Sequence, residues 1–265
     1  MCPQILLRRL FPTYFPKFDT RELRGAEVLD LGCFTGGRAV YWVEKYGIRK
    51  PRGMDINPIF ARTAMDFAEN RGVEAEFLTA VGEKLPYPSG SLDFVVSYDV
   101  FEHVQCLQEV MDECWRVLKP GAQLLAVFPQ FYQPLEAHLG AVSGMPGLHL
   151  LFSSSAITQA FNEIIAERGP DAYWYRREEP TLAPWEKLPT LNGITVAGFR
   201  RILARDHRWR IAHWSRRPIF SDGRKAKRPV FRVLRALASV PARLPLLEEV
   251  FLGRICVILS KETQG

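Results

Sequence analysis

Long apolar runs are absent from this 265-residue chain. The runs at 124–128 and 255–259 are five residues each, against the roughly 20 that span a bilayer. Near the start, residues 5–7 are the only apolar run before Arg8 and Arg9, which is too short for a secretory leader. Cysteine is also scarce: the five cysteines are odd in number and lack metal or redox spacing. We therefore expect a cytoplasmic protein with reduced thiols and no metal site.

The bulk composition excludes the disordered, collagen-like and coiled-coil classes, because 47% of residues are apolar and 24% are charged. The net charge of +6 is unevenly distributed. Residues 200–235 carry thirteen Lys and Arg against two Asp, a local charge of +11, so the rest of the chain sums to −5. The basic character belongs to one segment, which bears on partners.

Apolar periodicity predicts strands that alternate with helices over the first 128 residues. This alternation favours βαβ crossovers and an α/β fold with a mostly parallel sheet covered on both faces. The expected strands are 26–31, 51–56, 74–78, 92–97, 123–128, 209–214 and 254–259. The expected helices are 36–46, 58–71, 104–118, 153–168, 194–205 and 229–240.

A glycine-rich turn connects the first expected strand to the first helix, in the run VLDLGCFTGG at 28–37. Asp30 lies at the tip of the strand. Gly32 permits a tight turn, and Gly36 lets the backbone approach a ligand without a Cβ in the way. Taken alone, such a turn is typical of many nucleotide-binding folds.

Three further segments follow in order. They are Asp55 in GMDINP, GEKLPYPSGSLDFVVSYDVFEHV at 82–104 and RVLKPGAQLLAVFP at 116–129. With the glycine turn, they resemble the class I S-adenosylmethionine-dependent methyltransferases over about residues 26–130. The branch that they most resemble is methyltransferase type 11, which includes quinone and sterol methyltransferases. The resemblance implies a Rossmann-like seven-stranded, mostly parallel sheet with helices on both faces, an antiparallel last strand and an insertion after strand 5.

The resemblance also implies S-adenosylmethionine as the cofactor, with Asp55 on the ribose hydroxyls and Asp30 near the amino-acid portion. The cofactor-binding residues that it implies are Asp30, Gly32, Cys33, Gly36, Asp55, Ile56, Val81, Gly82, Glu83 and Ser97.

Two positions depart from the family pattern. Phe34 replaces the middle glycine of the turn, so we expect either a negative φ there or a ring packed aside. Val81 stands where this branch usually has an acid for the adenine amino group. Adenine recognition is then expected to fall to backbone groups and Glu83.

The chain divides into four expected parts. Residues 1–25 form an N-terminal arm and residues 26–130 the cofactor-binding core. Residues 131–192 form a substrate insertion or lid. Residues 193–265 complete the sheet and include a basic amphipathic helix.

Methyl transfer to a hydroxyl or phenol calls for a general base, and histidine is well matched near neutral pH. His149 and His138 both fall in the insertion, which in an open α/β sheet lies over the carboxyl ends of the strands. We favour His149, in a leucine-rich setting, over His138. The alternative is a partly buried histidine satisfied by backbone groups.

The motif N/D/S-P-P-Y/F/W is missing after the fourth strand, which argues against base and glutamine N-methyltransferases. We therefore expect methylation of a small, lipophilic acceptor, with oxygen favoured over nitrogen or carbon. One alternative is an NAD-binding oxidoreductase, although the turn lacks G-x-G-x-x-G. The other alternative is a non-catalytic cofactor-binding or membrane-associated protein.

The helix expected at 229–240 has an apolar face opposite Arg228, Arg232 and Arg235. The favoured interpretation is that the apolar face packs on the sheet and the arginines are solvated. The second is contact of 224–240 with an anionic membrane surface, which would make the protein peripheral to a membrane. Nucleic acid is the least favoured partner, since stacking aromatics are not evident there. The sequence does not indicate the oligomeric state.

Overall fold

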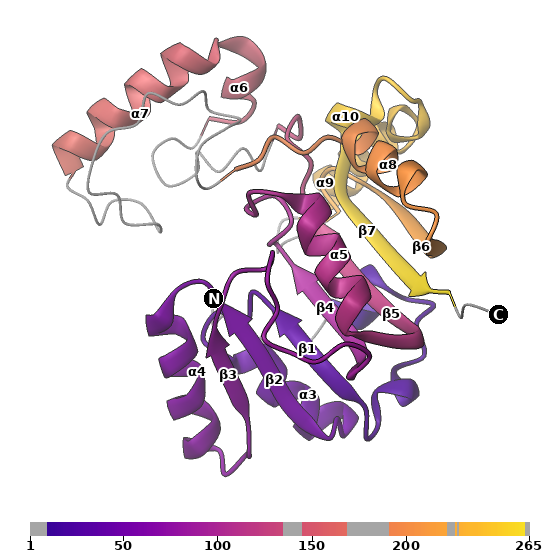
Figure 1. The fold of residues 1–265 in the computed structure, drawn as a ribbon. Coiled ribbons are helices and arrows are strands. Elements are labelled where there is room, and N and C mark those ends of the chain that lie inside the picture. The colour runs from indigo at the N-terminus through magenta and orange to yellow at the C-terminus, as the bar shows by residue number, and fades with distance from the viewer. Residues whose placement is uncertain (1–9, 135–144, 169–190, 222–225, 227, 263–265) are drawn as a thin grey trace.

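The computed structural model describes residues 10–134, 145–168, 191–221, 226 and 228–262. A seven-stranded sheet in the order β3-β2-β1-β4-β5-β7-β6 runs through the molecule (Figure 1). The strands are β1 (Glu27–Leu31), β2 (Lys50–Asp55), β3 (Glu76–Thr79), β4 (Leu92–Tyr98), β5 (Leu118–Phe128), β6 (Trp209–Pro218) and β7 (Leu252–Lys261).

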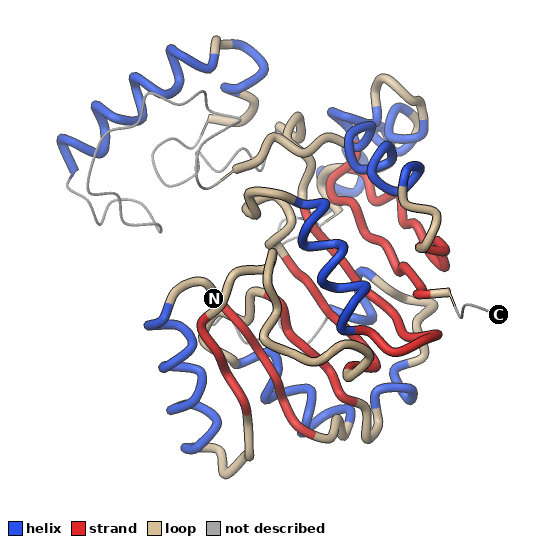
Figure 2. The backbone as a smooth tube through the Cα atoms, in the orientation of Figure 1, coloured by secondary structure: helices blue, strands red, loops and turns tan. Residues whose placement is uncertain are grey.

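The described helices lie between these strands and beyond the sheet (Figure 2). They are α2 (Leu10–Tyr14), η1 (Thr20–Leu23), α3 (Gly37–Tyr46), α4 (Pro58–Asn70), α5 (Leu107–Val117), α6 (Leu148–Leu151), α7 (Ser154–Arg168), α8 (Val196–Arg205), α9 (Pro229–Ser239), η5 (Pro241–Arg243) and α10 (Glu248–Phe251).

The first five strands pair in parallel, whereas β7 is antiparallel to both β5 and β6. This confirms the expected Rossmann-like, mostly parallel sheet and its antiparallel last strand. No helix in the described part of the chain is long and apolar enough to cross a membrane.

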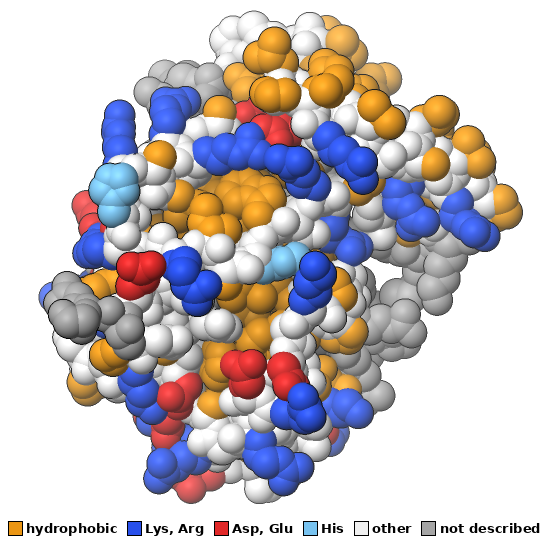
Figure 3. All heavy atoms as spheres, turned by 90° about the vertical axis from the view of Figure 1, so that its right-hand side faces the viewer, with side chains coloured by type: hydrophobic (Ala, Val, Ile, Leu, Met, Phe, Trp, Pro, Cys, Tyr) orange, Lys and Arg blue, Asp and Glu red, His pale blue; other side chains and the backbone are white. Residues whose placement is uncertain are grey.

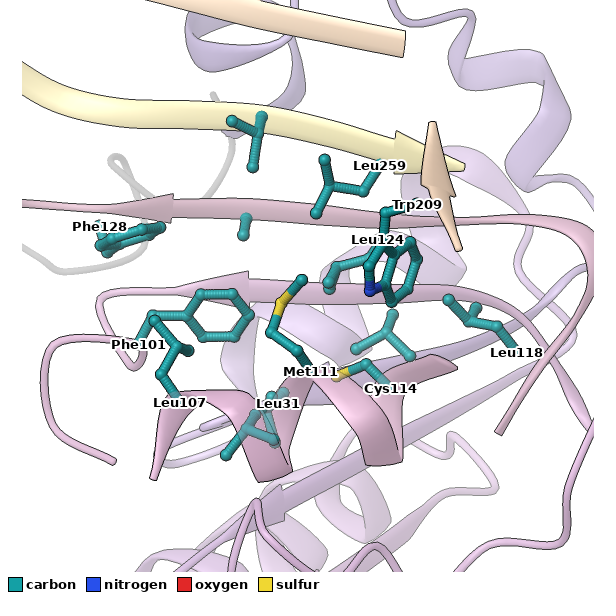
Figure 4. Packing of buried hydrophobic residues seen from close by; sticks show 14 of the residues in the cluster. Leu31, Phe101, Leu107, Met111, Cys114, Leu118, Leu124, Phe128, Trp209 and Leu259 are labelled. Carbon is teal, nitrogen blue, oxygen red and sulfur yellow. The ribbon is translucent and has the colours of Figure 1, made fainter. Parts of the chain in front are cut away.

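Side chains alternate between two apolar layers along the central strands. On one face, Phe101, Met111 and Phe128 belong to a cluster in which α5 and α8 cover the sheet (Figure 4). On the other face, Phe11 and Trp42 pack with their ring centroids 5.4 Å apart in a second cluster. Helices therefore cover both faces, as the sequence predicts.

Several boundaries differ from the predicted ones for local reasons. Helix α5 begins at Leu107 rather than at residue 104, because its N-cap residue, Cys106, has an extended backbone. The helix after the insertion begins at Val196 rather than 194, because Thr195 Oγ1 accepts a hydrogen bond from Gly198 N at 2.9 Å.

The last two strands are longer than predicted. The sixth strand continues to Pro218, beyond 209–214, and the seventh covers Leu252–Lys261, beyond 254–259. Every residue of β7 is buried, including charged ones at its ends that interrupt the apolar run. Residues beyond the predicted bounds pair with the neighbouring strand, Arg217 with Arg254 and Pro218 with Leu252, so pairing between β6 and β7, rather than hydrophobicity, sets these lengths.

The apolar face of α9 does not pack on the sheet, so the favoured interpretation of this helix is wrong. Ala238 is its one buried residue, and Phe231 contacts Phe220 with ring centroids 5.7 Å apart. Because side chains turn by about 100° per residue, this attachment leaves Val233 and Leu237 pointing outward, 59% and 68% exposed.

The insertion after β5 is held at the carboxyl edge of the parallel strands at both its ends. At its start, Gln130 Nε2 donates to the carbonyls of Leu252 and, at 3.3 Å, Glu249. At its return, Asn192 Nδ2 donates to the carbonyls of Phe101 at 2.7 Å and Val104 at 2.9 Å. In Figure 1, α6 and α7 stand beyond this edge.

Candidate cofactor and acceptor site

The turn after β1 is built around two glycines in left-handed conformation, Gly32 at φ +71° and Gly36 at φ +73°. A Cβ on Gly32 would come within 2.2 Å of the Val100 side chain. A Cβ on Gly36 would come within 2.6 Å of Ala64 Cβ and 2.9 Å of Phe77 Cζ. Close packing and backbone conformation therefore both require glycine at these positions.

Phe34 also has a positive φ, +50°, so the expectation of a negative φ is wrong. It keeps the left-handed conformation natural to the glycine that it replaces, at a cost of about 1–2 kcal/mol. Its ring packs aside on Phe60, with centroids 4.2 Å apart, which is the other expected solution. Phe34 as a whole stays 54% exposed.

Asp55 is fixed at the carboxyl end of β2 by two backbone donors. Phe34 N donates to Oδ2 at 3.0 Å and Asn57 N donates to Oδ1 at 2.9 Å. Burial raises the pKa of the Asp55 carboxyl, and these backbone hydrogen bonds oppose the rise. Each carboxylate oxygen has two lone pairs, so a ligand hydroxyl can still donate to either one.

Exposed apolar side chains lie in the segments around this carboxylate. Ile56 follows Asp55 directly and is 65% exposed, while Val81 follows the neighbouring strand β3 and is 42% exposed. Ala80 N donates to the Asp55 carbonyl at 3.1 Å, which holds the two strand ends together. A carboxylate beside apolar surface suits a ribose joined to an aromatic base, so these residues fit the adenosine part of S-adenosylmethionine.

Asp30 does not present a free carboxylate at the edge, because it is fully buried and paired with Arg38. Arg38 Nε donates to Oδ1 at 3.0 Å and to Oδ2 at 2.9 Å, and its Nη2 also donates to Oδ1. The same Nη2 lies 3.2 Å from the carbonyl oxygen of Gly32. Burial raises the pKa of Asp30 to about 6, and the guanidinium of Arg38 opposes that rise.

Four other predicted cofactor residues make contacts within the fold. Cys33 is buried, with a pKa raised by burial, and its Sγ donates to the Phe34 carbonyl at 3.6 Å. Ser97 is buried in β4. Gly82 lies against α5, and Glu83 Oε1 accepts from the backbone N–H groups of Gln105 and Cys106 at 2.9 and 3.2 Å.

Tyr98 lies at the end of β4, and from the sequence it is a candidate pocket-lining residue without an assigned role. The guanidiniums of Arg38 and Arg254 both lie near its ring, with their Cζ atoms 5.6 and 5.4 Å from the ring centroid. Its hydroxyl is 3.3 Å from that of Tyr14, and Arg254 pairs with Asp99. No local spacing could reveal these contacts, since the partners Arg38, Tyr14 and Arg254 lie far from Tyr98 in the sequence.

His149 lies in α6, inside the insertion. Its ring contacts Phe131 edge-on, with centroids 5.5 Å apart, and both ring nitrogens are buried. Burial lowers the pKa of the imidazole, and the backbone of Tyr132 and of Phe131 opposes the change. The neutral, basic form is therefore favoured. His138 lies outside the described residues.

Residues 29–126 match the family described as a methyltransferase domain. This match covers the strands and helices from β1 to β5, so this part of the chain is similar to methyltransferase domains. Norajmaline N-methyltransferase of Rauvolfia serpentina is 32% identical over 110 residues, which are 41% of this chain and 37% of that protein. A probable chloroplastic tocopherol O-methyltransferase of Oryza sativa subsp. japonica is 32% identical over 111 residues, 41% of this chain and 30% of that protein. The chain thus spans about a third of the length of these curated relatives.

Solved structures share the fold of the whole chain. A Haloferax volcanii structure, the complex between the Trm112 methyltransferase activator and a methyltransferase, has a TM-score of 0.56 at 15% identity and covers 98% of this chain and 93% of that one. The [4+2]-cyclase SpnF has a TM-score of 0.57 at 17% identity and covers 98% of this chain and 81% of that one. Since one of these proteins is a cyclase, the fold alone does not define the reaction.

Proposed function

We propose that this protein transfers the methyl group of S-adenosylmethionine to a small, lipophilic acceptor, with a hydroxyl oxygen as the favoured site. The observation that carries the proposal is the fixed carboxylate of Asp55 flanked by the exposed side chains of Ile56 and Val81, within the part of the chain that matches methyltransferase domains. The relatives named above are N- and O-methyltransferases, so they leave the acceptor atom open.

Each part of the cofactor would meet a different part of the edge. Asp55 would accept hydrogen bonds from the ribose hydroxyls, and Ile56 and Val81 would contact the adenine faces. The backbone of the turn from Gly32 to Gly36, braced by the buried pair beneath it, would hold the amino-acid portion. When bound, S-adenosylmethionine supplies an electrophilic methyl group on a sulfonium.

The acceptor side would be formed by the insertion, because both its ends are fixed at the carboxyl ends of β4 and β5. Its described core is apolar: Ile157, Phe161 and Leu191 are buried, and Phe131 and Leu148 pack against them. An apolar acceptor suits such a surface better than a charged one, since a charge would lose its hydration there.

His149 would act as the general base for a hydroxyl acceptor. Its lowered pKa keeps the imidazole neutral near pH 7, ready to take the proton that the acceptor oxygen loses as it attacks. An amine acceptor that binds already neutral would depend less on this base. The choice between oxygen and nitrogen therefore has a consequence that mutation of His149 can measure.

The test is a turnover assay with S-adenosylmethionine labelled in its methyl group and matched acceptors. A lipophilic phenol, the corresponding aniline and a hydrophilic phenol are compared, and products are identified by mass spectrometry. We expect the methyl ether of the lipophilic phenol as the main product. Methylation of the aniline alone would refute the oxygen assignment. Binding of S-adenosylmethionine without turnover on any acceptor would favour the non-catalytic alternative.

A further inference from the structure

A continuous set of exposed aliphatic side chains follows α9 and the chain after it. Within α9, Val230, Val233 and Leu237 are 56%, 59% and 68% exposed. After it, Leu246 is 88% exposed. We call this set the apolar ridge, and its members are Val230, Val233, Leu234, Leu237, Val240, Leu244, Leu246 and Leu247. Helices on globular proteins normally bury such a stripe, whereas these side chains are exposed in the part of the chain that the structure describes.

The ridge lies in a stretch of uniform charge. Residues 223–247 contain seven Lys and Arg and no Asp or Glu. Arg228, Arg232 and Arg243 are exposed at or beside α9. Figure 3 shows hydrophobic and basic side chains next to one another across the upper part of this face of the molecule.

We propose that the apolar ridge docks on a lipid bilayer that contains anionic headgroups. Aliphatic side chains can enter the boundary between headgroups and acyl chains while the arginines pair with lipid phosphates. A second copy of the chain would bring the same unbroken positive charge against the ridge, which opposes self-association. Single-stranded nucleic acid is bound by stacking aromatics beside basic residues, whereas every member of the ridge is aliphatic.

Docking would also orient the site. The strand β6 ends at Pro218, which pairs with Leu252 at the start of β7, so the chain between them leaves and returns at the carboxyl edge of the parallel strands. The start of the insertion is fixed at the same edge, because Gln133 Nε2 donates a hydrogen bond to the carbonyl oxygen of Gly253, near the start of β7, at 3.3 Å. A bilayer on the ridge would therefore adjoin the acceptor side. This consequence rests on the proposed function, since a lipophilic acceptor could then enter from the lipid.

The test is flotation of the full chain with vesicles of phosphatidylcholine alone or mixed with phosphatidylglycerol, at low and high salt. We expect at least about tenfold more protein on the anionic vesicles, with most of it released by high salt, because surface charge attraction is screened. Val233→Ser/Leu237→Ser and Arg228→Glu/Arg232→Glu should each lower binding by about tenfold or more. The matched controls Ile211→Ser, on β6, and Arg62→Glu, on α4, should leave it unchanged.

Equal binding to both kinds of vesicle, or binding to neither, would overturn the proposal. So would a concentration-dependent dimer on gel filtration that Val233→Ser/Leu237→Ser abolishes, because the ridge would then be a contact between two copies. Far-ultraviolet circular dichroism and thermal unfolding establish that each variant is folded. S-adenosylmethionine binding, measured without vesicles, should be the same in all of them, so failure of the membrane proposal is distinct from failure of the proposed function.

Discussion

Arg38 and Asp30 form a buried ion pair directly beneath the glycine turn, with Nε of Arg38 at 3.0 and 2.9 Å from the two carboxylate oxygens. Both side chains are almost fully inaccessible, at 7% and 0% exposed. Because the same guanidinium lies 3.2 Å from the carbonyl oxygen of Gly32, the pair connects the tip of β1 to the first turn of α3. The acid at this tip thus braces the turn instead of facing solvent.

Replacing one partner of this pair should destabilise the fold strongly, because it leaves an uncompensated buried charge. We expect Arg38→Met to lower the free energy of unfolding by about 3–5 kcal/mol. Urea denaturation measures the change, with Arg62→Met on the exposed side of α4 as the control. The double variant Arg38→Met/Asp30→Asn should recover part of the loss. A loss of less than about 1 kcal/mol of unfolding free energy in Arg38→Met would contradict a stabilising role for this ion pair.

Gly36 and Gly72 offer a matched pair for the turn, since both have positive φ, +73° and +63°. Gly36→Ala should cost more than Gly72→Ala, because the new Cβ would meet Ala64 at 2.6 Å, whereas nothing lies within 4 Å of a Cβ on Gly72. We expect about 1–3 kcal/mol from overpacking in addition to the conformational cost that both share. Chemical denaturation measures the free energy of unfolding of the two variants. Equal losses of stability in both would refute the packing argument.

Glu83 distinguishes a structural role from a ligand-binding role. Its carboxylate accepts two backbone hydrogen bonds before α5, so Glu83→Ala should lower the free energy of unfolding by about 1–3 kcal/mol. The affinity for S-adenosylmethionine, measured by calorimetry on the folded variant, should stay within a factor of about three. A tenfold loss of affinity with unchanged stability would restore the adenine-binding role that the sequence suggested.

His149 should control the acid side of the pH profile. Its pKa is lowered by burial, so the imidazole becomes neutral at a pH below its ordinary value of 6.5. Turnover on a hydroxyl acceptor should therefore rise with pH through a window below 6.5 and then level off. His149→Ala should abolish this dependence and cost about 10²–10⁴ in turnover, with cofactor affinity nearly unchanged.

The same shift has a consequence for stability, with its sign fixed by the direction of the shift. Because the pKa of His149 is lower in the folded state than in the unfolded chain, its contribution is present above about pH 6.5. That contribution is lost as the pH falls through the folded-state value.

A His149→Ala variant with near-normal turnover and an unchanged pH profile of turnover would contradict the role of His149 as the base. It would shift the assignment to His138 or to an acceptor that needs no base.

The sequence predicts the sheet well, because parallel strands buried on both faces carry compact apolar runs between glycine and proline boundaries. The position of Asp55 is predictable for the same reason, since the end of a strand fixes it. Contacts between residues far apart in the sequence are not predictable in this way. Nothing near Tyr98 in the sequence indicates that Tyr14 approaches it, and nothing near Arg38 separates a surface arginine from the buried partner of Asp30.

Helix α9 shows the limit of amphipathic patterns. Its periodicity correctly predicts a helix with one apolar stripe, but the pattern does not say what covers that stripe. The attachment of the helix through Phe231 and Ala238 turns Val233 and Leu237 to the outside. The division of the chain at residues 25, 130 and 192 stays a prediction.

Calorimetric titration of the purified protein with S-adenosylmethionine and its demethylated product tests the central claim most directly. We expect a dissociation constant of about 10⁻⁶ M, or about 8 kcal/mol of binding free energy. Asp55→Ala should weaken binding by about 1.5–3 kcal/mol, since it removes hydrogen bonds to a charged group. The control Asp66→Ala, on the exposed side of α4, should leave binding unchanged. No heat with either ligand, together with tight binding of NAD, would contradict the methyltransferase account.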